Sequence, residues 1–196
     1  MTSKFLETLG SWRNVADSAR TTISKEPGTK EPSSQWKRRL LLSEHSPIRQ
    51  ISIRFIWQGL KSWISVHFVR HKFGIEHFVS TQRTDRTGVN RDDLKQSNLV
   101  NHEILINQQA IINISRKRLC SQASSETRKS WKEFLKSIEK YHPELVSVAV
   151  VECVYRNGFC PEYKSCGYNQ TEKFEKELCK YVKDMEHQIN SKLRLK

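Results

Sequence analysis

The chain has 196 residues, enough for one domain with its own core or for a subunit that completes its core by assembly. Hydrophobic content of 36% and a mean hydropathy of -0.68 are low for a self-sufficient globular domain. No apolar run approaches the roughly 18 residues of a membrane span. The N-terminal residues lack the apolar core of a signal peptide. We therefore expect a soluble, cytoplasmic protein with no membrane partner.

The net charge is +13, so the chain attracts polyanions at low salt. Anionic nucleotides, a flavin dinucleotide and nucleic acid all fit this charge, which does not choose among them. Five cysteines without a secretion signal argue against a disulfide framework and favour reduced thiols or a metal site.

Short elements and one loop are predicted in the N-terminal third. Apolar residues at helical spacing predict helices over 8–22, 36–46 and 59–71, whereas alternation over 51–55 predicts a half-buried strand. Residues 23–35 hold two prolines and indicate a surface loop.

The rest of the chain is predicted to be mainly helical. Residues 84–97 are polar and indicate a loop over the preceding basic stretch, and 126–141 are predicted to form an amphipathic helix. Residues 145–154 are a short apolar segment, helix or strand. A charged terminal helix is predicted over 171–193, with an apolar stripe for packing or oligomer contact: Phe174, Leu178, Tyr181, Met185 and Ile189.

The longest helical pattern covers 98–119, and its polar residues include Asn107 and Arg118. Eleven residues are close to three helical turns, so these two side chains are predicted to point the same way. The alternative is a buried helix with capped polar ends. The apolar stripe consists of Val100, Ile104, Ile111 and Ile114.

A basic stretch between 66 and 88 is the first candidate site. An apolar run turns abruptly into Arg70-His71-Lys72, and Ser80 and Arg83 follow. Guanidinium, ammonium and hydroxyl groups suit phosphate oxygens. A solvated basic loop is the alternative, but the triplet follows an apolar segment that must be packed, which favours a site.

Metal ligands are a second possibility. His67 and His71 lie four residues apart, as in a zinc-binding pair, but no third ligand or catalytic Glu accompanies them, which disfavours a metal at this pair. Three thiols fall in the Cys-rich loop 153–168, and a fourth follows the long helix. They suggest a four-thiolate zinc site or an iron–sulfur cluster, but their spacings are not the standard CxxC pair, which favours free thiols. The four thiols are those of Cys120, Cys153, Cys160 and Cys166.

The basic stretch resembles the signature of the flavin-dependent thymidylate synthases, which opens Arg-His-Arg and continues through Ser, Asn-Glu, Ser and Arg-Tyr. Arg70-His71-Lys72 falls on the opening triplet, with Lys72 in place of the second Arg. Ser80 falls on the second Ser. One inserted residue puts Arg83 on the Arg position, which is otherwise Gln82. The Asn-Glu pair is missing.

Two further blocks carry the same resemblance. Near the N-terminus, Ala19-Arg20-Thr21-Thr22 looks like the family's Ala-Arg-x-Ser, and Gln50 falls where a flavin-side His is usual. In the predicted long helix, Asn107, Asn113 and Arg118 keep the family's spacing, and Gln122 takes the place of a later His.

The resemblance implies one domain over 1–196 with an α/β (α+β) fold, a small antiparallel sheet flanked by helices, and active sites at homotetramer interfaces. It implies transfer of a one-carbon unit from methylenetetrahydrofolate to C5 of dUMP, with FAD as cofactor and NADPH as reductant. Nucleic acid is not required.

The residue roles follow from the resemblance. Arg118 is the expected catalytic residue. The expected substrate contacts are His67, Arg70, Ser80, Arg83 and Arg118, and the expected flavin contacts are Thr22, Gln50, Arg70, His71, Lys72, Asn107, Asn113 and Gln122. Two alternatives stay open: a related flavin-dependent pyrimidine nucleotide hydroxymethylase or modifying enzyme, and a non-catalytic basic nucleic-acid-binding protein on this scaffold.

Overall fold

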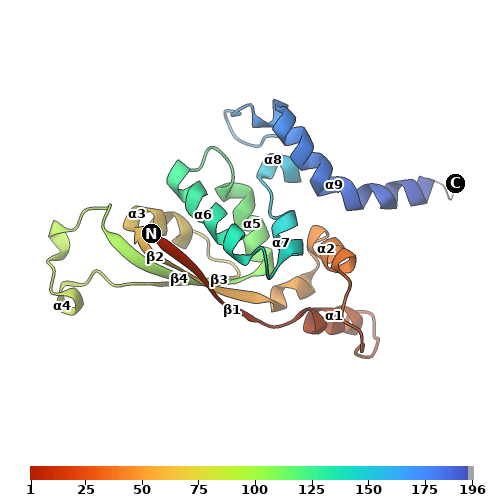
Figure 1. Cartoon of the computed structure of the whole chain (residues 1–196), viewed down its shortest axis with the longest axis horizontal. Helices are drawn as coiled ribbons and strands as arrows, with labels where there is room; N and C mark the ends of the chain where they lie inside the picture. Colours follow the sequence, from red (N-terminus) through yellow and green to blue (C-terminus); the bar gives the residue numbers. More distant parts are fainter. Residues whose placement is uncertain (194–196) are drawn as a thin grey trace.

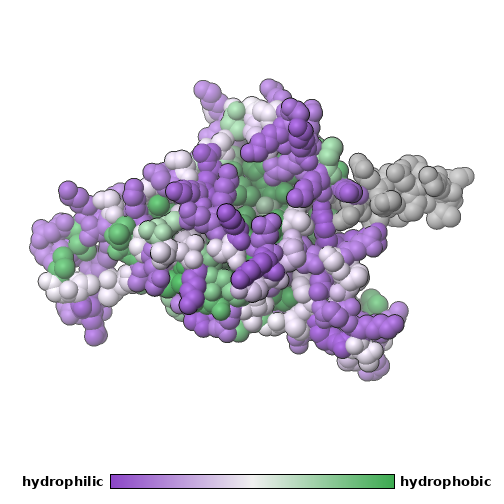
Figure 2. Space-filling view, viewed as in Figure 1, coloured by the Kyte–Doolittle hydropathy of each residue, from purple (hydrophilic) through white to green (hydrophobic). Residues whose placement is uncertain are grey.

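The computed structural model describes the backbone of residues 1–193 and the side chains of residues 1–183. The last two members of the predicted terminal stripe, Met185 and Ile189, lie outside the described side chains. The molecule consists of a twisted sheet with helices packed over one face (Figure 1). In the same view, hydrophilic side chains dominate the surface, with smaller apolar areas between them (Figure 2).

The sheet has four antiparallel strands in the order β1-β2-β4-β3. Ile53 of β2 pairs with Ile106 of β4, which in turn pairs with Ile75 of β3. The small antiparallel sheet flanked by helices that the sequence resemblance implied is therefore present. The strands are β1 Thr2–Leu9, β2 Ser52–Lys61, β3 Ile75–Val79 and β4 Leu99–Asn107.

The prediction of one long helix over 98–119 is wrong in its first half. Residues Leu99–Asn107 form the central strand β4, and only Gln108–Arg118 form a helix, α5. Burial alternates along β4, where Val100, Ile104 and Ile106 face the helices, as expected for a strand. Pairing with β2 on one side and β3 on the other overrides the local helical spacing, because β preference depends on neighbouring strands.

Most other predicted helices are present with shifted ends. Residues 8–9 close β1 and 59–61 close β2, whereas the segment 145–154 contains two short helices. Strands β1 and β3 were not predicted. The helices are α1 Trp12–Thr21, α2 Ser34–Leu42, α3 Ser62–Val69, α4 Thr84–Thr87, α5, α6 Ser125–Ile138, α7 Pro143–Val148, α8 Glu152–Tyr155 and α9 Glu172–Leu193.

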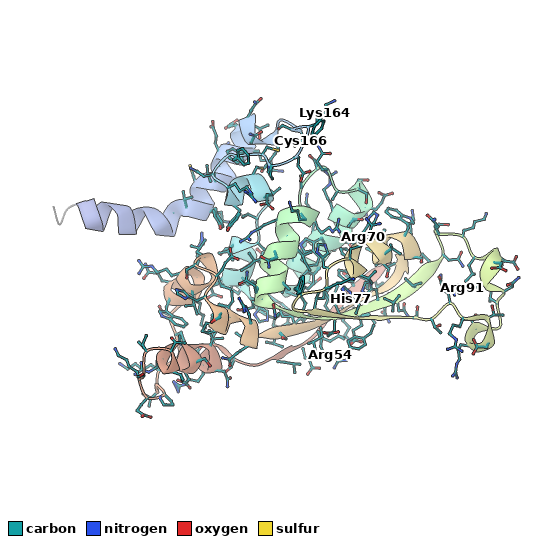
Figure 3. The ribbon with its side chains drawn as sticks, turned by 180° about the vertical axis from the view of Figure 1, so that it is seen from behind. Arg54, Arg70, His77, Arg91, Lys164 and Cys166 are labelled. Atoms are coloured by element: carbon teal, nitrogen blue, oxygen red, sulfur yellow. The ribbon has the colours of Figure 1, made fainter. Side chains whose placement is uncertain are left out.

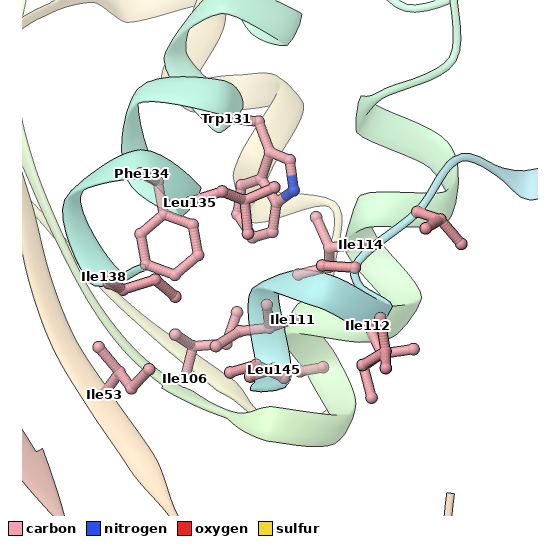
Figure 4. Close-up of a cluster of buried hydrophobic side chains, with 14 of the residues drawn as sticks. Ile53, Ile106, Ile111, Ile112, Ile114, Trp131, Phe134, Leu135, Ile138 and Leu145 are labelled. Carbon is pink, nitrogen blue, oxygen red and sulfur yellow. The ribbon is translucent and has the colours of Figure 1, made fainter. Parts of the chain in front are cut away.

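The core lies between the sheet and the layer of α3, α5, α6 and α7, as Figure 4 shows for part of it. Trp57 of β2 stacks on Phe68 of α3 at 4.9 Å, and Phe134 of α6 meets Phe55 edge to face. The indole N–H of Trp131 donates to the Ser115 hydroxyl at 2.9 Å, so this buried polar group is satisfied. This packing places the ends of α3 and α5 over the sheet.

The opposite face of the sheet carries an ion network in which Arg54 contacts Glu7 and Glu103. A hairpin arm with α4 extends from the β3–β4 end (Figure 1). Within residues 1–193, no helix combines the length and apolar character needed to cross a membrane.

Candidate functional site

A cluster of basic side chains forms where the ends of α3 and α5 meet. Arg118 is the last residue of α5, and its Nε donates to the His71 ring at Nε2, 2.9 Å away. Its Nη2 donates to the carbonyl of His67 at 2.7 Å. The sequence prediction that Arg118, His67 and His71 share one site is consistent with this geometry, and the exposed Arg70 caps α3 beside them.

The electrostatics of this cluster favour an anion. In the described part of the chain, no carboxylate forms an ion pair with Arg118, and burial followed by the charge of Arg70 lowers its pKa. Burial, then Arg118, lowers the pKa of His71 to about 4, so this ring is neutral at pH 7. A half-buried guanidinium without a carboxylate partner gains from an anionic ligand, because the ligand supplies the missing opposite charge.

The basic loop 70–74 is anchored at both of its ends. His71 is held through its ring by Arg118 and through its carbonyl by His77, whose Nε2 lies 2.9 Å from that oxygen. At the other end, the Gly74 carbonyl accepts from the backbone N–H of Asn107 at 2.9 Å. The triplet is therefore not a freely solvated loop.

Gly74→Ala is expected to destabilise the protein by about 2–4 kcal/mol. Gly74 has φ of +72°, and an added Cβ would lie 2.6 Å from the side-chain nitrogen Nδ2 of Asn107. Asn107 cannot move away without loss, because its Oδ1 caps α5 at the Ala110 N–H. Urea unfolding measures the effect. Gly88→Ala is the matched control, since Gly88 has a similar φ of +71° and no heavy atom within 4 Å of an added Cβ. Equal losses for the two variants would contradict the steric argument.

Three residues of this region were missed by the sequence prediction. Thr127 of α6 lies 2.8 Å from His67 Nδ1, and His77 Nδ1 lies 2.9 Å from His102 Nε2. His77 and His102 come from strands β3 and β4, neither of which was predicted. The only signal in the sequence was the alternation Val100, His102, Ile104, which places His102 on the buried face of a strand.

The expected flavin contacts near the N-terminus lie around one end of α1. The Thr22 hydroxyl donates to the Ala19 carbonyl at 2.7 Å, and the Gln50 amide contacts the Ser18 hydroxyl. Both contacts are with residues of α1, and in the described part of the chain no hydrogen bond joins Thr22 or Gln50 to the Arg118 cluster.

The asparagines expected to face the flavin occupy different environments. Asn107 is the N-cap of α5, so its side chain serves the helix. Asn113 is exposed and accepts from Gln109 and Arg116. Gln122 follows α5 and donates to the Lys164 carbonyl at 2.9 Å, which ties it to the Cys-rich loop.

Ser80 lies at the base of the hairpin arm, and Arg83 is the N-cap of α4 farther along it. Ser80 extends the β3–β4 pairing through the backbone of Asn101, and Arg83 forms a two-point ion pair with Asp85. Figure 3 shows Arg91 far out on this arm, away from Arg70 and His77. In the described part of a single chain, no hydrogen bond or ion pair joins Arg83 to the Arg118 cluster.

The predicted metal site is not formed. The four cysteines line one cavity of about 320 Å³ between α5, α8 and the Cys-rich loop, but all are free thiols, and residues 1–183 contain no group of three or more His, Cys, Asp or Glu that could hold a metal. Burial raises the pKa of Cys120 and Cys153, which favours thiols over the thiolates that metals bind. A hydrogen bond with Ser121 lowers the pKa of the exposed Cys166.

No family model matches the sequence, and no curated protein matches it. Solved structures do match the fold. Two are the flavin-dependent thymidylate synthase ThyX of Helicobacter pylori with FAD and dUMP, each with a TM-score of 0.63 and 11% identity; they cover 76% of this chain, and 100% and 99% of theirs. A third is the UMP/dUMP methylase PolB of Streptomyces cacaoi bound to 5-Br dUMP, with a TM-score of 0.59, 14% identity and coverage of 75% and 93%.

The chain is therefore an α+β protein of the class in which helices cover one face of a small antiparallel sheet. Within that class, it has the fold of the flavin-dependent thymidylate synthases, as the sequence resemblance predicted. At these identities the likeness establishes the fold, and activity must be argued from the site.

Proposed function

We propose that this protein binds FAD and dUMP and transfers a one-carbon unit to C5 of the pyrimidine. The observation that carries the proposal is the half-buried Arg118, which has no carboxylate partner in the described residues and contacts His71 of the basic triplet. This cluster lies in a fold shared with structures that contain FAD and dUMP.

The side chains present fit the charge of a flavin dinucleotide. Arg70 and Lys72 are exposed, lie on an anchored loop and form no ion pair with a carboxylate in the described part of the chain. They and His71 would hold the phosphates. Asn107, Asn113, Gln122 and the pair Thr22 and Gln50 would contact the flavin.

Arg118 would stabilise the charge that develops on the uracil carbonyls. C5 of a pyrimidine is a weak nucleophile, and its reaction needs negative charge to spread over these oxygens, where a fixed guanidinium acts best. His67, held by Thr127 at 2.8 Å, would face the nucleotide beside it. When bound and reduced by NADPH, the flavin would supply the hydride, and methylenetetrahydrofolate would supply the carbon.

A second subunit would complete the site. Ser80 and Arg83 would take the dUMP phosphate of a neighbouring subunit, because the arm that carries them leads away from their own Arg118 cluster. The edge strand β3 carries exposed Phe78, and Phe73 in the preceding turn is 93% exposed. Such apolar side chains at a sheet edge suit subunit contact in a homotetramer.

Departures from the family pattern favour a second candidate, a related enzyme that hydroxymethylates or otherwise modifies a pyrimidine nucleotide. Gln50 and Gln122 stand where ionisable histidines are usual, and the Asn-Glu pair is missing. These positions affect the donor and the product. The basic triplet and Arg118 serve the same flavin and nucleotide in either enzyme.

The purified protein is expected to be yellow or to take up FAD, and dUMP is expected to perturb the flavin spectrum. Mass spectrometry of the nucleotide after incubation with NADPH and methylenetetrahydrofolate distinguishes methylation from hydroxymethylation. A colourless protein that binds no FAD, but binds nucleic acid with a steep dependence on salt, would overturn the proposal in favour of a nucleic-acid-binding scaffold.

A further inference from the structure

A pair of hydrogen-bonded imidazoles joins the buried core to the backbone of the basic loop. His102 lies on β4, is fully buried and packs against Trp57 and Phe68. Its Nε2 lies 2.9 Å from Nδ1 of His77, whose own Nε2 lies 2.9 Å from the His71 carbonyl. The resemblance that identified the other site residues assigns no role to His77 or His102.

The register of the sheet explains this contact. His77 pairs with Ile104, and His102 lies two residues from Ile104 on the same strand, so the two imidazoles are diagonal neighbours on the helix-covered face. Aromatic side chains bridge that separation. A buried imidazole in an apolar pocket is costly, and apolar side chains would fill the space without that cost. Packing alone therefore does not explain why His77 and His102 are histidines.

Hydrogen-bond chemistry determines where the protons are. A guanidinium only donates, so Arg118 makes the neutral His71 ring accept at Nε2 and carry its proton on Nδ1. A carbonyl only accepts, so His77 carries a proton on Nε2, and the neutral ring then accepts at Nδ1. His102 must then donate from Nε2, and its buried Nδ1 has no partner in the described residues.

The hydrogen bonds run in one order: His102 donates to His77, and His77 donates to the His71 carbonyl. The His71 carbonyl fixes the tautomer of His77, and the accepting Nδ1 of His77 in turn makes Nε2 of His102 the donor. The neutral state of His102 agrees with this order, because burial, then His77, lowers its pKa to about 4. The orientation of the His77 ring thus depends on a buried neutral donor, much as outer residues orient a metal-binding histidine.

We propose that His77 is a positioning residue for ligand binding: oriented by His102, it holds the backbone of loop 70–74 so that Arg70 and Lys72 present their charges to phosphate. Arg118 holds the ring of His71 and Asn107 holds Gly74, so His77 supplies the third anchor. The role in FAD binding rests on the proposed function, whereas the anchoring of the loop does not.

Three substitutions at position 77 separate the two contacts. His77→Gln keeps a donor near the Nε2 position for the His71 carbonyl. His77→Asn keeps an acceptor near the Nδ1 position for His102, and His77→Phe keeps only the ring. FAD affinity, measured by flavin absorbance, is expected to weaken about tenfold in the Asn and Phe variants and to be largely retained in the Gln variant.

Two measurements on the ligand-free protein make the inference independent of FAD. Nitrogen-15 spectra of the imidazoles should show His71 protonated at Nδ1, and His77 and His102 protonated at Nε2. Hydrogen exchange of the amides at 71–73 should accelerate in the Asn and Phe variants but not in the Gln variant.

The outcomes can be told apart. Equal losses of stability in all three variants, with loop exchange and affinity unchanged, would show a packing role and overturn the inference. Other tautomers for His77 or His102 would overturn it as well. If the parent chain binds no FAD but the exchange pattern appears, the proposed function fails while the anchoring by His77 stands.

Discussion

Arg118→Ala is expected to lower turnover of dUMP by about a hundredfold or more while the chain stays folded. The guanidinium is fixed at two points, by the His71 ring at 2.9 Å and the His67 carbonyl at 2.7 Å. A preorganised donor of this kind typically contributes at least this factor to the rate, because its orientation costs nothing during the reaction. The kcat and KM for dUMP, measured with excess FAD, test the prediction.

FAD is expected to remain bound to this variant, although less tightly. Loop 70–74 loses the anchor on the His71 ring but keeps the contacts from His77 and Asn107. Arg118→Lys is the sharper control, since it retains the charge, loses the two-point donation and should restore little activity. Arg70→Ala should show the reverse order, with weaker FAD binding first. A variant at Arg118 that turns over dUMP like the parent would refute the assigned role.

The second large effect is expected in the dependence of stability on pH. In the folded chain, burial as the largest cause holds the pKa of both His71 and His102 at about 4, against an ordinary value of 6.5. Between these values the unfolded chain binds more protons than the folded chain, so the free energy of unfolding falls as pH falls. The loss begins near pH 6.5 and is complete below pH 4.

For the fully buried His102, the shift corresponds to roughly 3 kcal/mol. His67 and His142 add to the loss in the same direction, because burial lowers their pKa as well. Urea unfolding at a series of pH values between 7 and 4 measures the slope. His102→Phe removes one buried imidazole from an aromatic pocket and should flatten the curve. A parent protein equally stable at pH 7 and pH 4.5 would contradict the prediction.

Local sequence was sufficient for elements whose apolar spacing matched one period. Trp131, Phe134 and Ile138 recur at helical spacing in the predicted helix 126–141, and all three are buried on α6. The same holds for Val15 of α1. The resemblance to a family pattern also associated Arg118 with the Arg70-His71 pair, because such a pattern preserves the order of side chains that meet in space.

Strand pairing could not be predicted from local apolar spacing. The stretch Leu99–Asn107 has apolar residues at 100 and 104 that suit a helix and at 104 and 106 that suit a strand, and only its neighbours β2 and β3 decide between them. The consequence for the site is direct. A helix would have separated His102 from His77, whereas the strand makes them diagonal neighbours.

Local residue patterns therefore indicated the basic triplet and the amphipathic helices, since these depend on local spacing and charge, whereas the family resemblance indicated Arg118. Tertiary structure alone decided that β4 is a strand, that Asn107 caps α5, and that His102 lies against His77 beneath the basic loop. The physical reason is that a strand's hydrogen bonds and the burial of its side chains come from segments far away in the chain, and these are absent from any local window of sequence.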